Sequence, residues 1–185
     1  MLKIQNFILA FLIISLFSVN CKDTGTEPSS GQNLLSNGTF EVDHTPTLQG
    51  WRFGNPQLAS LVKEAPIGGG NWSLKLSADW APTTGFVYTP VEGVKPGDVV
   101  RLSAFIRAIG SSGGGFVTLG VGPSVWSTTA RSVGSQDTLW KEITLIDTLA
   151  LGPNDSLWVV LSSLNTEIIV REGLFDLVRL ERLSK

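Results

Sequence analysis

From Asn33 onward, the sequence alternates short apolar and polar runs that are punctuated by Gly, Pro and Asn. Residues 72–77 alternate strictly, and residues 98–108 place branched or small apolar side chains at every second position. A period of two is typical of strands with one buried face, and no stretch shows the 3.6-residue period of an amphipathic helix over three turns. The chain is therefore predicted to be all-β.

Turn signals separate the apolar runs. Residues 66–70, 95–98 and 152–155 each combine Gly with Pro, as tight turns require. Many short strands joined by such turns favour a β-sandwich. Further strands are expected at residues 57–64, 84–90, 115–121, 138–147, 156–163 and 174–182.

The N-terminus has the anatomy of a secretory signal. Lys3 is followed by an apolar run over residues 7–19, and then by Asn20 and Cys21. This run is shorter than the roughly 20 residues that a membrane-spanning helix needs. Residues 1–20 are therefore predicted to be a signal peptide that is removed.

Cys21 is the only cysteine of the chain. A cleavage site directly before it resembles the bacterial lipobox, which implies a lipid on Cys21 and a lipid-anchored place in the bacterial cell envelope, expected at the outer membrane on its periplasmic or outer surface. Asn20 departs from the small residue usual at this position, so an ordinary signal peptide stays the alternative. Residues 21–32 are polar and read as the lipidated cysteine and a flexible tether. Residues 33–185 are expected to form one domain.

Charge excludes one class of partner. Without residues 1–20, the chain has 13 basic and 16 acidic residues, and the basic ones are not clustered. Binding to a phosphate backbone depends on clustered Lys and Arg, so no nucleic-acid partner is expected.

Four segments of the chain occur in an order that is typical of one known family. They are Asn33–Glu41 with Gly50-Trp51, Trp72–Leu76, Val94–Arg107 and Phe175–Leu180. Together they resemble the carbohydrate-binding modules of the family 4/9 type, which are galactose-binding-like jelly rolls. The resemblance implies a jelly-roll β-sandwich that is not an enzyme and that binds a poly- or oligosaccharide. One departure is Val100, where family members often have Tyr.

The same resemblance implies a structural calcium ion. Many family members hold it between the opening Glu and the closing Asp, which here are Glu41 and Asp176, with loop carbonyls near Gly70 as further candidates. Carboxylates and backbone carbonyls are the hard oxygen ligands that calcium prefers. The alternative is that each acid only accepts hydrogen bonds or faces water.

Aromatic side chains are the candidates for sugar binding, because an aromatic face can stack on the apolar side of a pyranose. The chain has six tryptophans. Trp72 and Trp140 lie on apolar stripes, and Trp51 occupies the buried aromatic position of the family. These three are predicted to belong to the core.

Trp80 and Trp126 lie in predicted loops without an apolar stripe, which makes them stronger candidates for a ligand contact. Trp158 alternates with apolar neighbours and is expected to share the outward face of residues 98–108. The alternative for each is packing beneath a loop. The candidate groove consists of Trp80, Trp126, Phe105, Arg107 and Trp158.

Catalytic groups are scarce. His44 is the only histidine, so no histidine metal cluster is available, and a Ser-His-Asp triad would depend on one loop residue. A carboxylate pair at about 5–10 Å would suit glycoside cleavage, but no acid lies in a recognisable catalytic motif. The first hypothesis is thus a sugar-binding lipoprotein. A structural or protein-interacting envelope lipoprotein is the alternative, and a small polysaccharide-cleaving enzyme ranks last.

Overall fold

The computed structural model describes residues 31–79, 84–163 and 171–183. The predicted signal peptide, Cys21, most of the tether and Trp80 lie outside these residues. In the described part, one short 3₁₀ turn, η1 (Pro56–Leu58), accompanies the strands, and no helix there is long and apolar enough to span a bilayer. The strands are β1 (Glu41–Val42), β2 (Thr45–Pro46), β3 (Arg52–Phe53), β4 (Ala59–Val62), β5 (Ser73–Ala78), β6 (Phe86–Val91), β7 (Val99–Ile109), β8 (Gly115–Ser124), β9 (Ser127–Ser135), β10 (Lys141–Thr148), β11 (Ser156–Ser163) and β12 (Arg171–Arg182).

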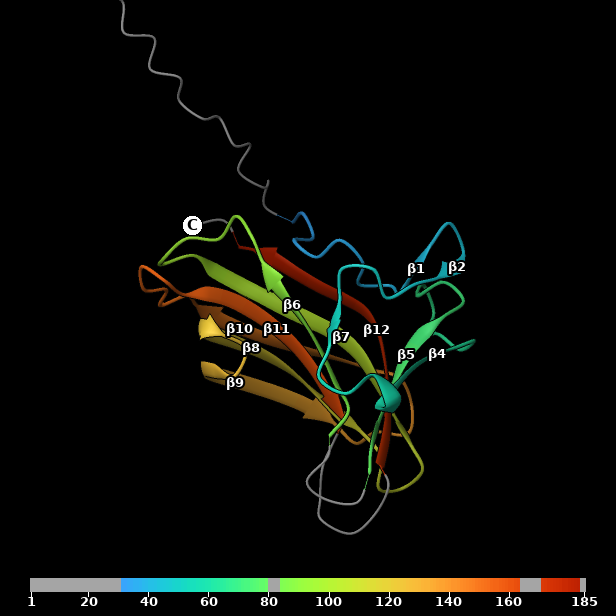
Figure 1. Cartoon of the computed structure of the whole chain (residues 1–185). Coiled ribbons are helices and arrows are strands. Elements are labelled where there is room, and N and C mark those ends of the chain that lie inside the picture. Colours follow the sequence, from blue (N-terminus) through green and yellow to red (C-terminus); the bar gives the residue numbers. More distant parts are fainter. Residues whose placement is uncertain (1–30, 80–83, 164–170, 184–185) are drawn as a thin grey trace, which may run out of the picture.

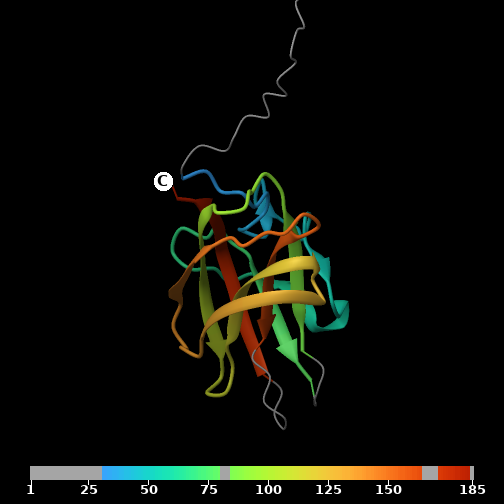
Figure 2. The ribbon, with the colours of Figure 1, turned by 90° about the vertical axis from the view of Figure 1, so that its left-hand side faces the viewer.

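Two five-stranded sheets form the body of the molecule. The first sheet has the strand order β10-β7-β12-β5-β4, and the second has the order β3-β6-β11-β8-β9. Figures 1 and 2 show the sheets as two layers, so that β12 (red) and β11 (orange) belong to different layers although they follow each other in the chain. The predicted all-β jelly-roll sandwich is confirmed.

The core lies between the sheets and comes from strict alternation along each strand. Val100, Leu102, Ala104 and Ile106 of β7 are fully buried, as the pattern of residues 98–108 predicts. Leu157, Val159 and Leu161 of β11 are buried from the opposite layer. Each large aliphatic side chain of this kind stabilises the fold by about 1.5–3 kcal/mol through its removal from water.

The sequence did not indicate β9. Its residues, Ser-Thr-Thr-Ala-Arg-Ser-Val-Gly-Ser, are mostly exposed, because β9 is an edge strand that pairs with β8 alone. A strand that buries almost no side chain has no apolar period to display. Edge strands rich in polar residues are common, because they discourage pairing with other molecules.

Trp51 lies in the core as predicted, whereas Trp140 does not. Trp51 is buried and donates from Nε1 to the carbonyl of Asn37 at 2.7 Å, as expected of a core tryptophan. Trp140 is partly exposed and does not belong to the buried core cluster, so its prediction was wrong. It precedes edge strand β10, and its ring lies under the guanidinium of Arg107, with 5.8 Å between the guanidinium carbon and the ring centroid.

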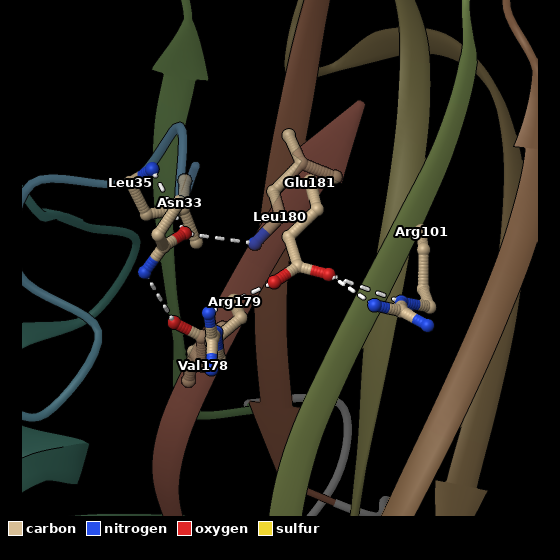
Figure 3. A network of polar contacts seen from close by, with 7 residues as sticks. All are labelled: Asn33, Leu35, Arg101, Val178, Arg179, Leu180 and Glu181. Atoms are coloured by element: carbon tan, nitrogen blue, oxygen red, sulfur yellow. Dashed lines mark hydrogen bonds and ion pairs between the residues drawn. The ribbon is translucent and has the colours of Figure 1, made fainter. Parts of the chain in front are cut away.

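The start of the described chain is tied to the last strand. β5 stops pairing with β12 at Phe175, and Asn33 takes its place farther along β12 by a bridge to Glu181. Asn33 Oδ1 accepts from the backbone N–H of Leu180 at 2.9 Å and of Leu35 at 3.1 Å, as Figure 3 shows. The point at which the predicted tether ends is therefore fixed at the edge of the first sheet.

Candidate functional site

Four aromatic rings gather on the outer face of the second sheet. Phe86 and Tyr88 come from β6, Trp158 from β11, and Trp126 from the turn between β8 and β9. The ring centroids of Tyr88 lie 6.0 Å from Phe86, 6.4 Å from Trp126 and 6.1 Å from Trp158. Phe86 and Trp126 meet edge to face at 5.3 Å. We call these four side chains the aromatic cluster.

Alternation along the strands sends these rings outward. Val87 of β6 is fully buried, so its neighbours Phe86 and Tyr88 point to the other side of the sheet. Trp158 is placed in the same way between buried Leu157 and Val159. Its Nε1 donates to the carbonyl of Gly122 on β8 at 3.1 Å, which fixes the orientation of the indole.

Trp126 is the most exposed ring, with a relative exposure of 72%. The turn that carries it folds closely against β8, because a Cβ at Gly122 would overlap the carbonyl of Ser127. An open depression of about 400 Å³ lies beside the turn, bordered by Trp126, Thr128 and Asp155. Such a ring is available to a ligand without any rearrangement of the core.

The same outer face continues across β8 and β9 with smaller groups. Thr118 Oγ1 and Ser132 Oγ share a hydrogen bond of 2.7 Å. Phe116 lies on the same cross-strand row as Ser162 and Phe86, and its ring covers Gly134 beside a second depression of about 240 Å³. Aromatic rings together with hydroxyl groups can bind the two faces of a sugar, its apolar C–H side and its hydroxyls.

The structure divides the predicted groove. Trp126 and Trp158 lie together in the aromatic cluster, whereas Phe105 and Arg107 lie on the outer face of the first sheet. Arg107 forms an ion pair with Glu64, with 3.0 Å between Nη2 and Oε2. Trp80 falls outside the described residues. The expectation that Trp158 shares a face with Phe105 was wrong, because β11 pairs with β6 and β8, and β7 pairs with β10 and β12.

Phe86 and Tyr88 were not singled out from the sequence. Residues 84–90 were expected to form a strand, and two aromatics two positions apart on that strand share one face. Because Val87 and Val91 make the other face apolar as well, the alternation does not say which face is buried.

The two acids proposed as calcium ligands meet at the loop over residues 66–71. The carboxylate of Glu41 accepts from the backbone N–H of Asn71 at 3.1 Å, and a Cβ at Gly70 would overlap its Oε1. A Cβ at Gly69 would likewise overlap Oδ2 of Asp176. Glycines at these two positions therefore let the loop approach both carboxylates.

Asp176 is fully buried, and its Oδ1 accepts from the N–H of Leu177 at 2.7 Å. Its Oδ2 has no hydrogen-bond partner among the described residues. Burial raises the pKa of Asp176 to about 8; the Leu177 N–H opposes the rise and the charge of Glu41 adds to it. A buried oxygen without a donor fits a cation. Within the described residues, no group of three or more His, Cys, Asp and Glu gathers, so backbone oxygens would have to complete a calcium shell.

Solved structures share this fold at low sequence identity. A family 61 carbohydrate-binding module, TmCBM61, in complex with β-1,4-galactotriose has 20% identity and a TM-score of 0.55 over 82% of this chain and 99% of its own. A family 16 module has 21% identity and a TM-score of 0.59, over 80% of this chain and 99% of its own. The CBM22-1 xylan-binding domain of Paenibacillus barcinonensis Xyn10C has 17% identity and a TM-score of 0.59, over 84% and 97%.

No family model and no curated protein sequence matches the chain. The likeness to the three modules therefore concerns the fold, which is the jelly-roll sandwich of carbohydrate-binding modules.

Proposed function

We propose that this chain is a non-catalytic lipoprotein of the bacterial cell envelope whose jelly-roll domain binds a poly- or oligosaccharide on the outer face of the second sheet. The aromatic cluster carries this proposal. Trp126 exposes most of its surface, although a large exposed ring gains nothing for folding. The similar modules support it, since one was solved with β-1,4-galactotriose and another is a xylan-binding domain.

The cluster suits a sugar because its rings sit at different angles. Phe86 and Tyr88 are nearly parallel, with 29° between their planes, whereas Trp126 stands at 86° to Phe86. A pyranose that stacks on one ring can therefore meet the edge of another. Hydroxyl groups of Thr118 and Ser132 lie on the same face and can exchange hydrogen bonds with sugar hydroxyls.

Titration calorimetry with β-1,4-galactan and β-1,4-xylan oligosaccharides tests this function. Trp126→Ala is expected to weaken binding about tenfold, which corresponds to the loss of roughly 1.4 kcal/mol of stacking. Trp140→Ala removes a partly exposed tryptophan from the first sheet and should leave affinity unchanged. Equal affinities for the wild type and Trp126→Ala would contradict the placement of the site. Binding to no glycan, with recovery of one envelope protein in pull-downs, would favour the protein-interaction alternative.

The anchor is proposed from the sequence, since Cys21 directly follows the predicted signal peptide. The lipid would hold the domain, and any bound sugar, at the membrane surface through the tether of residues 22–32. Metabolic labelling with a radioactive fatty acid is expected to mark the wild type and not Cys21→Ser. Labelling of both proteins, or of neither, would contradict the anchor.

Calcium is proposed as a structural ion held by Glu41 and Asp176. The unpartnered Oδ2 of Asp176 and the nearby Glu41 carboxylate support this, as do the glycines that bring the loop close to both. The ion would tie the opening of the domain to its closing strand and compensate two neighbouring negative charges.

A further inference from the structure

The outer face of the second sheet also carries one arginine. β3 pairs with β6 so that Arg52 is opposite Tyr88 and Phe53 is opposite Val87. Phe53 packs against the core and Val87 is fully buried, so Arg52 and Tyr88 point outward together. Cross-strand partners on one face have Cβ atoms about 4.5–5.5 Å apart, which places the Arg52 side chain beside the aromatic cluster.

Arg52 is not engaged by the protein itself. Five of the seven arginines in the described residues form ion pairs, namely Arg101, Arg107, Arg131, Arg179 and Arg182. Arg52 is exposed, and its guanidinium has neither an ion pair nor a hydrogen bond with a described residue. No described residue therefore occupies its donors.

Among residues 31–79, 84–163 and 171–183, no acid forms an ion pair with Arg52. Asp155 borders the depression beside Trp126, where its carboxylate accepts from the N–H of Gly152 at 2.8 Å. The outward positions of the other four strands of the second sheet, as described, are aromatic, aliphatic, hydroxylic or glycine. They are Phe86, Tyr88, Pro90, Phe116, Thr118, Gly120, Gly122, Thr128, Ala130, Ser132, Gly134, Ser156, Trp158, Val160 and Ser162.

We propose that Arg52 makes this face selective for polysaccharide chains that carry carboxylate groups, that is, chains with uronic acid residues or side groups. The proposal rests on the sugar-binding function proposed above. A sugar ring stacked on Tyr88 brings its substituents within reach of the neighbouring guanidinium. A guanidinium binds a planar carboxylate through two parallel hydrogen bonds, and both charges assist them.

The test compares matched neutral and acidic oligosaccharides on two backbones. The pairs are a β-1,4-xylan oligosaccharide with and without a glucuronic acid side group, and a galacturonan oligosaccharide with free or with methyl-esterified carboxylates. The wild-type chain is expected to bind the acidic member of at least one pair about threefold to tenfold more tightly, in the range of a partly exposed charge pair. High salt should reduce this preference, because ions screen exposed charges.

Arg52→Gln is expected to abolish the preference without weakening the neutral oligosaccharide. Lys141→Gln is the matched control, since it removes one exposed positive charge from the first sheet and should keep the preference. Arg52→Lys keeps the charge but not the paired donors, so this variant should retain part of the preference for the acidic oligosaccharide.

Three results would overturn the inference. Equal affinity of the wild type for both members of each pair, or a preference that survives Arg52→Gln, would exclude a role for Arg52 and leave the sugar-binding function in place. Binding to none of the four oligosaccharides would overturn the inference and the sugar-binding function together.

Discussion

Two acidic residues of β12, Asp176 and Glu181, lie five positions apart, and both are buried. Glu181 is held between two arginines: Arg101 donates to its Oε2 from Nε at 3.2 Å and also from Nη2, and Arg179 lies 2.9 Å from its Oε1 (Figure 3). Within the described part of the chain, Asp176 accepts from the N–H of Leu177 alone, and its Oδ2 has no partner. The hydrogen bond from Arg101 holds the pKa of Glu181 below its ordinary value, whereas burial raises the pKa of Asp176.

The two carboxylates differ in whether the described protein groups around them compensate their burial. A buried charge is stable where partners compensate the loss of water, so the protein alone satisfies Glu181. Among the described residues, Asp176 lacks such a partner for its Oδ2, which is the observation behind the proposed calcium ion. The same reasoning separates the two outer faces, because Arg107 on the first sheet is paired with Glu64, whereas Arg52 on the second sheet forms no ion pair with a described residue.

The largest expected effect concerns Asp176 in the absence of calcium. Its folded pKa of about 8 lies above its ordinary value of 3.8, so between these pH values the folded chain holds a proton that the unfolded chain has lost. Stability in chelator is therefore expected to fall as pH rises from about 4 to about 8, by several kcal/mol, since each pKa unit is worth about 1.4 kcal/mol. Urea denaturation at pH 5 and pH 8 measures this.

Asp176→Asn is the control for the predicted fall in stability with rising pH. The amide has nearly the same shape and no charge, so this variant should be more stable than the wild type at pH 8 in chelator and should show a flatter pH dependence. Identical slopes for the two proteins would mean that Asp176 does not titrate as its burial implies.

Calcium is expected to restore the folding stability that the chain loses at pH 8 in chelator. An ion that binds only the folded state at about 100 times its dissociation constant adds roughly 2.7 kcal/mol, seen as a rise in Tm. Glu41→Gln should lose most of this rise, because it removes one of the two nominated carboxylates. Glu64→Gln, an acid in an ion pair with Arg107, should keep it. A wild-type Tm that does not respond to calcium would contradict the ion.

The fold was predictable because the core imposes its period on the sequence. Residues 98–108 were expected to bury Val100, Leu102, Ala104 and Ile106, and β7 does so. Strand 156–163 was predicted with the bounds that β11 has. β9 was not predicted, because it buries few side chains and so shows no apolar period. Trp140 was wrongly assigned to the core, because a tryptophan before an edge strand can cover the outer face of a sheet as easily as the inner face.

The candidate site was only partly predictable, since local sequence does not encode which strands become neighbours. Trp126 was identified from its place in a loop, and Trp158 from its alternation. Trp158 was nevertheless grouped with Phe105, because each of the two residues points outward from its own strand. Only the sheet order shows that β7 and β11 belong to different layers, so that their outward faces lie on opposite sides of the sandwich. The juxtaposition of Glu41 and Asp176 followed from the family resemblance and not from spacing.

Glu181→Gln should destabilise the fold, in the opposite direction to Asp176→Asn. Hydrogen bonds to a charged group contribute about 1.5–3 kcal/mol, so a loss of this size is expected at pH 7. Because the folded pKa of Glu181 is lowered, its contribution is present above about 4.5 and is lost as pH falls through the folded value. Denaturation of both proteins across this range measures it. A loss that persists unchanged in acid would show that shape, and not charge, makes Glu181 important.

The smallest effect is expected for Arg179→Gln. The Arg179 side chain is 52% exposed, so water can replace most of its ion pair with Glu181. In this variant Arg101 still donates to Oε2 of Glu181. The loss should be below about 1 kcal/mol and should shrink further at high salt. Arg101→Gln should cost more, because Arg101 donates twice to the same carboxylate. The double variant should lose more than the sum of the two, because Glu181 would then be a buried carboxylate without a cation, which is the condition of Asp176. Additive losses would instead mean that each arginine stabilises the fold independently of the other.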